Sequence, residues 1–119
     1  MYVNCSNEEW LALVNDILIR NKSLYVRLGG ESMYPTIKNG EIVKIEPLQD
    51  KVNNNEVILY RDDRGKPIVH RVIKMDTQGD RPNYLVRSDN NWLGGDIVEE
   101  SQVLGKVTFV RRANSDMPV

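Results

Sequence analysis

Two residue types that often carry chemistry are scarce in this 119-residue chain, which has one cysteine and one histidine. A single cysteine, Cys5, cannot form an internal disulfide, and no cysteine and histidine cluster has the spacing of a zinc site. We therefore expect neither a metal nor a cofactor. The sequence also lacks a run of 18 apolar residues and a cleavable leader, so we expect a cytoplasmic protein without an integral membrane segment.

The chain likewise lacks an excess of charge of either sign. Its 16 lysines and arginines and its 17 aspartates and glutamates give a net charge of -1. Because proteins that bind nucleic acid or acidic lipid usually concentrate positive charge, we expect no nucleic-acid partner. The content of 40% hydrophobic and 28% charged residues is typical of a globular domain, and the length is that of one domain.

An amphipathic helix is expected from about residue 7 to residue 22. Ser6 and Glu9 have the spacing of a capping box, and Cys5 and Trp10 have that of a hydrophobic staple, which places the helix start at Asn7. Five apolar residues then recur at helical spacing, namely Trp10, Leu13, Val14, Ile17 and Leu18. We expect this face to pack on its own domain, the alternatives being a homodimer or heterodimer contact or a membrane surface.

From residue 24 onward the hydrophobic pattern is that of β-strands. Short runs rich in Val, Ile and Tyr lie at 24–28, 42–45, 57–60, 68–75, 84–87 and 103–110, between polar or Gly- and Pro-containing segments. Since no second helix is available for crossovers, the strands should pair antiparallel. We predict a mostly β domain over residues 1–112, a small antiparallel barrel or coiled sheet with one N-terminal helix. Residues 113–119 should be a flexible tail.

A candidate nucleophile follows the first expected strand. Gly29 and Gly30 precede Ser32, and glycine allows another backbone, such as that of a bound peptide, to come close. Pro35 fixes its own φ and restricts Tyr34, so the loop should be stiff enough to hold a reacting hydroxyl in place. Taken alone, the same segment is also a common glycine turn.

Two further segments contain polar residues that could act with this serine. His70 lies in an apolar strand, where a lone histidine is more often a structural hydrogen-bonding residue than a base. Side chains alternate along a strand, so His70 and Lys74 should share a face at a separation of about 13 Å. The loop after the strand at 84–87 contains Asp89 and Asp96 and, by itself, has the composition of an Asx-rich turn.

Taken together and in order, these segments resemble the signal peptidase I family. They also resemble the wider group of serine peptidases that shares its fold with the self-cleaving repressors of the bacterial damage response. Residues 32–36 with 40–43 are similar to the nucleophile box and residues 68–72 to the general-base box. Residues 88–91 with Asp96 are similar to the third box, and 103–107 to the closing strand. The resemblance covers about residues 24–112 and implies a serine endopeptidase with Ser32 as nucleophile.

The resemblance also implies roles for the other residues. A histidine at the base position is typical of the endoplasmic-reticulum, archaeal and sporulation-type branch, so His70 would accept the serine proton. An unperturbed pKa of about 6.5 leaves histidine largely neutral at pH 7. Asp96 is our choice for the orienting carboxylate and Asp89 for bracing the loop, and the choice between them stays open. The expected substrate-binding residues are Gly30, Met33 and Pro35.

The sequence departs from the family pattern in two places. Gly30 stands where the family often has a serine that helps the oxyanion hole, which leaves the Ser32 N–H as donor. Where the family has a membrane anchor, we expect the amphipathic helix instead. We therefore keep two hypotheses: a soluble endopeptidase that cleaves an extended peptide or leader paired with a strand edge, and a peptide-binding module without turnover. A self-cleaving regulator lacks support, since no DNA-binding domain precedes the strands.

Overall fold

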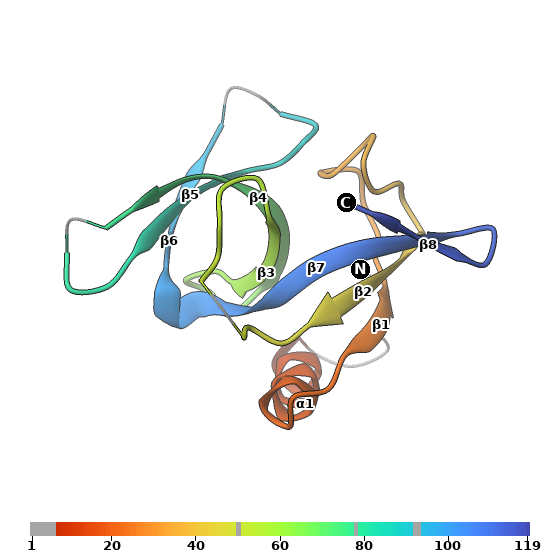
Figure 1. Cartoon of the computed structure of the whole chain (residues 1–119), viewed down its shortest axis with the longest axis horizontal. Coiled ribbons are helices and arrows are strands. Elements are labelled where there is room, and N and C mark those ends of the chain that lie inside the picture. The colour runs from red at the N-terminus through yellow and green to blue at the C-terminus, as the bar shows by residue number, and fades with distance from the viewer. Residues whose placement is uncertain (1–6, 50, 78, 92–93) are drawn as a thin grey trace.

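The computed structural model describes residues 7–49, 51–77, 79–91 and 94–119 and contains one helix and an eight-stranded antiparallel sheet (Figure 1). Helix α1 spans Asn7–Ile19. The strands are β1 (Leu24–Arg27), β2 (Ile42–Glu46), β3 (Val57–Arg61), β4 (Pro67–Asp76), β5 (Asn83–Arg87), β6 (Asp96–Glu99), β7 (Val103–Arg112) and β8 (Ser115–Pro118). A short 3-10 helix, η1 (Glu100–Gln102), connects β6 to β7. The predicted mostly β, antiparallel fold with one N-terminal helix is confirmed.

The long strand β7 joins two parts of the sheet, whose order is β1-β2-β7-β3-β4-β5-β6. Its second half pairs with β2 and its first half with β3, and β8 pairs with its last residues. Because β1 and β6 lie at opposite ends of this order, the sheet coils without closing (Figure 1).

Two hydrophobic cores lie on the two faces of β3. The first, which we call the helix-side core, includes Val57 and Leu59 and receives α1, β1 and β2. The second, the hairpin-side core, includes Ile58 and Tyr60 and receives β4, β5 and β6. Side chains alternate along a strand, so a strand buried on both faces reads as one continuous apolar run. This arrangement explains the run Val57-Ile58-Leu59-Tyr60, in which all four residues are buried.

Helix α1 packs on the sheet through residues spaced four apart, Trp10, Val14 and Leu18. Gly105 on β7 permits this approach, because an added Cβ would lie 2.8 Å from the Glu46 carbonyl oxygen and 3.1 Å from Leu18 Cδ1. The prediction that Leu13 belongs to the packed face is wrong: its side chain is 59% exposed. Residue 13 lies about 100° around the helix from residue 14, outside the narrow face that contacts the sheet.

The predicted C-terminal end of α1 is wrong, and the residues of its predicted N-terminal cap lie outside the described part of the chain. The helix ends at Ile19 instead of residue 22, and Asn21 has a left-handed φ of 60°. Cys5 and Ser6, on which the predicted capping box and staple depend, lie outside the described residues. Within the described residues, no helix combines the length and the hydrophobicity needed to cross a bilayer.

Two leucines of α1 provide a matched test of this packing. Leu18→Ala should lower the free energy of unfolding by about 2 kcal/mol, because it opens a cavity in the helix-side core. Leu13→Ala should change it by no more than about 0.5 kcal/mol, since that side chain is exposed. Urea denaturation of both variants measures the difference. Equal losses, or a dimer that only Leu13→Ala dissociates, would contradict the packed face described here.

Two strands were not predicted, and one of them replaces the expected tail. Residues 115–118 form β8, which pairs with β7, so the prediction of a flexible tail over 113–119 is wrong for these residues. The connecting residues Ala113 and Asn114 have φ of 48° and 65°, as in the two-residue hairpin turns that usually contain glycine. Because neither position is a glycine, the Asn-Gly or Asp-Gly pair that usually marks such a hairpin is missing here. The other unpredicted strand, β6, pairs with β5 and begins at Asp96.

Candidate active site

The loop between β1 and β2 presents Ser32 at the surface and is fixed at its base. The Leu28 N–H donates to the Glu41 carbonyl at 2.9 Å, and the Gly40 N–H donates to the Leu28 carbonyl at 2.7 Å. Gly30 adopts a φ of +89°, which favours glycine, and its N–H donates to Asn39 Oδ1 at 2.9 Å. The loop is thus held at both ends, with the exposed serine between them.

Two apolar side chains anchor the same loop in the helix-side core. Met33 and Ile37 are 4% and 3% exposed, and the Ile37 N–H donates to the Met33 carbonyl at 2.9 Å, which closes a single helical turn. The Tyr34–Pro35 peptide bond is cis. Because the buried residues flank the turn, Ser32 is attached to a packed segment although its own side chain is exposed.

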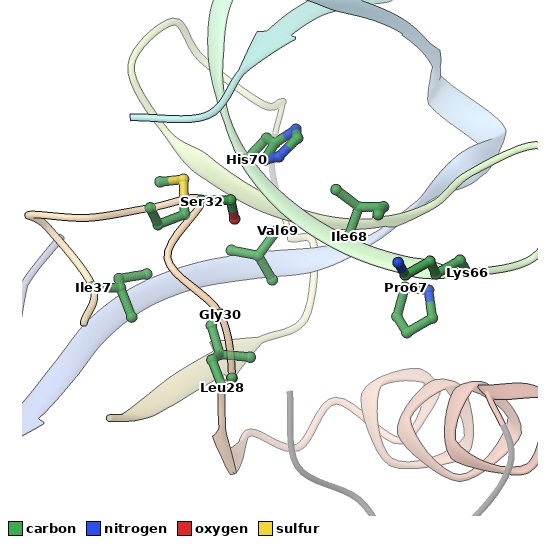
Figure 2. Close-up of a pocket in the computed structure, with 11 residues that line it drawn as sticks. Leu28, Gly30, Ser32, Ile37, Lys66, Pro67, Ile68, Val69 and His70 are labelled. Carbon is green, nitrogen blue, oxygen red and sulfur yellow. The ribbon is translucent and has the colours of Figure 1, made fainter. Parts of the chain in front are cut away.

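Ser32 and His70 line one cleft of about 480 Å³, between the β1–β2 loop and the beginning of β4 (Figure 2). The apolar side chains that line it include Leu28, Met33, Ile37, Pro67, Ile68 and Val69. The fold therefore brings together the predicted nucleophile and the predicted base. Of the expected substrate-binding residues, Gly30 and Met33 line this cleft, whereas Pro35 is not among its lining residues.

One edge of β4 faces this cleft. The Lys66 carbonyl accepts from the Asp62 N–H at 2.9 Å, and the Val72 N–H donates to the Glu56 carbonyl at 2.8 Å, so even-numbered residues of β4 bond toward β3. In an antiparallel pair these groups alternate, which turns the backbone N–H and C=O of Val69 away from β3. Strand β5 pairs with β4 only from Arg71 onward. The Val69 backbone groups are therefore at an open strand edge beside Ser32.

The His70 side chain is half-buried, and its Nδ1 lies 3.1 Å from the hydroxyl oxygen of Tyr60 on β3. Burial lowers the pKa of His70, and the negative charges of Asp96 and Asp89 oppose this effect only in part. The imidazole is therefore neutral at neutral pH, which is the form that can accept a proton.

Lys74 does not share the face of His70, contrary to the prediction. The pairing of β4 with β5 shifts by one residue between Val72 and Lys74. Val72 and Met75 therefore both pack in the hairpin-side core, and Lys74 between them is exposed. A β-bulge of this kind adds one residue to one strand and reverses the alternation beyond it. Lys74 is thus removed from the site.

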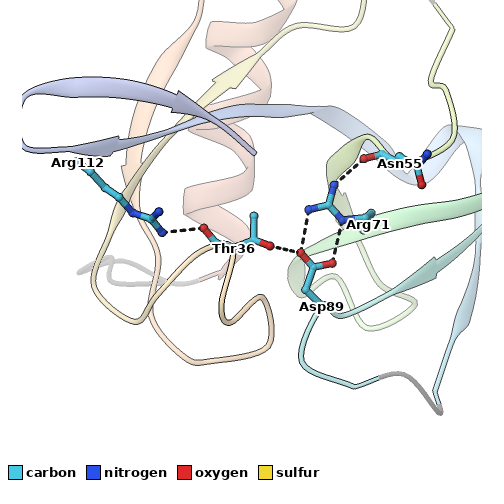
Figure 3. A network of polar contacts seen from close by, with 5 residues as sticks. All are labelled: Thr36, Asn55, Arg71, Asp89 and Arg112. Carbon is cyan, nitrogen blue, oxygen red and sulfur yellow. Dashed lines mark hydrogen bonds and ion pairs between the residues drawn. The ribbon is translucent and has the colours of Figure 1, made fainter.

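The Asp89 side chain connects the loop after β5, in which it lies, to Thr36 of the β1–β2 loop and to Arg71 of β4 (Figure 3). Arg71 donates to both of its carboxylate oxygens, from Nε at 2.9 Å and from the second guanidinium nitrogen at 2.8 Å. Thr36 Oγ1 also donates to Asp89, at 2.6 Å, and the neighbouring Asn90 N–H donates to the Ser32 carbonyl at 3.0 Å. Burial raises the pKa of Asp89, but the hydrogen bonds from Arg71 and Thr36 outweigh it and leave the pKa below its usual value.

Asp96 has a different environment at the start of β6. Its carboxylate is exposed and lines a second cavity of about 320 Å³, together with Tyr60 and His70. In the described part of the chain, neither Asp89 nor Asp96 is hydrogen-bonded to His70, which has Tyr60 as its partner. Sequence reasoning missed Tyr60. Residues 62–65, Asp-Asp-Arg-Gly, have the composition of a tight turn, and a hairpin through them places Tyr60 and His70 on the same face.

The described residues include no group of three or more His, Cys, Asp or Glu side chains arranged to hold a metal ion. The polar residues that line the cleft include Ser32, His70 and Lys66, and the open backbone edge of β4 lies beside them. This set can carry out proton transfer and nucleophilic attack on a peptide paired with the open edge of β4.

Comparison with known proteins gives two matches. The family model described as Peptidase S24-like matches residues 3–108. The chain is also 36% identical over 69 residues to the signal peptidase complex catalytic subunit SEC11 of Yarrowia lipolytica. That alignment covers 57% of this chain and 40% of the relative, so the match spans less than half of the relative's length.

Proposed function

Because the chain belongs to the Peptidase S24-like family, we propose that it is a serine endopeptidase in which Ser32 is the nucleophile and His70 the general base. The single observation that carries this proposal is that Ser32 and His70, from different parts of the sequence, line the same cleft. The similarity to a signal peptidase catalytic subunit supports the same class of reaction.

In the proposed reaction, Nε2 of His70 accepts the proton of Ser32 Oγ as that oxygen attacks the carbonyl carbon of the substrate. The resulting imidazolium then gives this proton to the leaving amine, and water hydrolyses the acyl-enzyme by the same sequence. Burial lowers the pKa of His70, and the negative charge of Asp96, which opposes this effect, favours the imidazolium as it forms. In the described part of the chain, no hydrogen bond engages the Ser32 N–H, so it can serve the oxyanion.

The proposed substrate is an extended segment of a peptide or protein. Its backbone would pair with the Val69 N–H and C=O at the open edge of β4. Its side chains would enter the cleft, which has the apolar side chains of Leu28 and Met33 on the loop side. We propose a cytoplasmic location for this activity, because a single cysteine, which cannot form an internal disulfide, fits a reducing compartment.

A peptide-binding module without turnover is the second candidate function, and Gly30 is the observation that favours it. The glycine has no hydroxyl to offer an oxyanion, and its N–H already donates to Asn39. Both candidates would bind an extended peptide, so binding alone does not distinguish them. An experiment must instead report on the reactivity of the Ser32 hydroxyl.

A fluorophosphonate probe tests this reactivity in the intact protein. The endopeptidase should gain the mass of one adduct, located at Ser32 by peptide mapping, because a nearby base makes the hydroxyl nucleophilic. Ser32→Ala should not be labelled. Ser23→Ala removes an exposed serine before β1 and should be labelled like the wild type. Peptide binding without any labelling would reject the endopeptidase and favour the binding module.

A further inference from the structure

The Tyr60 hydroxyl forms a hydrogen bond with the side chain of His70, the proposed base. The tyrosine side chain is 3% exposed in the hairpin-side core, and its hydroxyl oxygen lies 3.1 Å from His70 Nδ1. The two rings meet edge to face, with centroids 6.0 Å apart and planes at 61°. Since the Tyr60 ring is buried in the hairpin-side core, this contact restricts the orientation of the imidazole.

The direction of this hydrogen bond decides whether His70 can work as a base. If Tyr60 donates to Nδ1, the neutral imidazole carries its proton on Nε2 and cannot accept another there. If Nδ1–H donates to Tyr60, Nε2 is free to receive the Ser32 proton. Burial and the charges of Asp96 and Asp62 raise the pKa of Tyr60, so its hydroxyl keeps a proton that needs its own acceptor.

The cavity of about 320 Å³ beside both rings contains candidate acceptors. Asp62 Oδ1 already accepts from the N–H groups of Arg64 and Lys66, at 2.9 and 2.8 Å. Asp63 lies near the side-chain amide of Gln102, at 3.5 Å. In the part of the chain that the structure describes, no hydrogen bond engages the Asp96 carboxylate. Asp62 is tied to its own turn through Oδ1. Of these carboxylates, Asp96 is the one whose charge acts on both Tyr60 and His70, so Asp96 is the better acceptor for the Tyr60 proton.

We propose that Tyr60 is a positioning residue for His70: its oxygen accepts the Nδ1 proton of His70, and its hydroxyl donates toward the Asp96 carboxylate. The negative charge of Asp96 then acts on the imidazole through the tyrosine hydroxyl. This inference rests on the proposed Ser32–His70 mechanism. It gives a role to a buried tyrosine that neither the family match nor the sequence motifs single out.

The tautomer of His70 tests the proposal without any substrate. His70 is the only histidine, so the ring nitrogens of the untagged, ¹⁵N-labelled full chain report on it alone. At a pH where the ring is neutral, the spectrum should show the proton on Nδ1 and none on Nε2. The opposite tautomer would overturn the proposal, because Tyr60 would then be a donor to Nδ1. This measurement uses the wild-type protein and does not depend on the stability of a variant.

Tyr60→Phe keeps the buried ring and removes the hydroxyl. Loss of an acceptor for Nδ1–H should lower the pH midpoint of the His70 titration, because a hydrogen bond to the charged form favours that form. A rise of the midpoint would overturn the proposal. Other charged groups near His70 are Asp96 on β6, Asp89 after β5 and the turn residues 62–64, and the variant leaves all of them in place.

Kinetics supply the second readout, with Tyr84→Phe as the matched control. Tyr84 is equally buried, at 3% exposure, and lies in the same core. Tyr60→Phe should lower kcat by about 10- to 100-fold and leave KM unchanged, whereas Tyr84→Phe should change kcat by about twofold or less. Asp96→Asn combined with Tyr60→Phe should be no slower than the slower single variant. Additive losses, or equal effects of the two tyrosine variants, would reject the relay.

The role of Tyr60 and the endopeptidase activity can each be rejected without rejecting the other. The Nδ1–H tautomer in a protein whose Ser32 does not react with the fluorophosphonate would support the Tyr60 contact and reject only the endopeptidase. The Nε2–H tautomer in a protein whose Ser32 does react would reject only the role of Tyr60.

Discussion

Ser32→Ala and His70→Ala are each expected to lower kcat/KM for a cleaved peptide by at least about 10³-fold, and the double variant should be little slower than either. In the proposed mechanism both residues act in one proton transfer, so removing either one abolishes the same step. Peptide affinity should be kept in Ser32→Ala, since the backbone contacts at the edge of β4 do not use the hydroxyl. Peptide cleavage assays of the three variants, with calorimetric binding of an uncleaved peptide, measure both effects.

The pH dependence of cleavage checks the identity of the base in the same assay. Burial lowers the pKa of His70, so kcat/KM should rise with pH through a midpoint below about 6.5 and then level off. Lys74→Ala serves as the control and should cleave at the wild-type rate, because the bulge in β4 turns this exposed residue away from the site. Full cleavage by His70→Ala, or a midpoint well above neutral pH, would show that another group is the base.

Asp89→Ala is expected to lower the free energy of unfolding by about 3 kcal/mol, because it leaves the guanidinium of Arg71 without its partner. The side chains of Arg71 and Asp89 are only 19% and 15% exposed, so solvent screens this pair weakly. The variant also removes the acceptor of Thr36 Oγ1 and thereby loosens the Ser32 loop from β4. Asp16→Ala, which breaks the exposed Asp16–Arg20 pair, should change stability by no more than about 0.5 kcal/mol.

The dependence of stability on pH identifies the Asp89 contribution. The folded-state pKa of Asp89 lies below its unfolded value, so its stabilisation is present above the unfolded pKa of about 4. It is lost as pH falls through the lower, folded-state pKa. Urea unfolding between pH 2 and pH 7 should therefore show a smaller acid-induced loss in Asp89→Ala than in the wild type. Parallel curves for the two proteins would contradict the role of Asp89 as a brace.

The sequence by itself determined the helix and the strands whose hydrophobic pattern lies within a few neighbouring residues. Trp10, Val14 and Leu18 repeat at helical spacing, and the run at 57–60 is apolar throughout because both faces of β3 are buried. The segments around Ser32 and His70 that resemble the family were also recognisable, since each is a short block with a fixed order. Such patterns depend on local backbone geometry and on which face meets a core, and both are encoded by neighbouring residues.

Tertiary structure alone decided which side chains meet, because register and bulges depend on residues far apart in the chain. The shift between β4 and β5 removed Lys74 from the His70 face, and the hairpin register placed Tyr60 against the imidazole. Arg71 and Thr36 engage Asp89, whereas Asp96 stays open beside the second cavity. No sequence pattern separates these two carboxylates. Their roles depend on distances and burial, which exist only once the strands have paired.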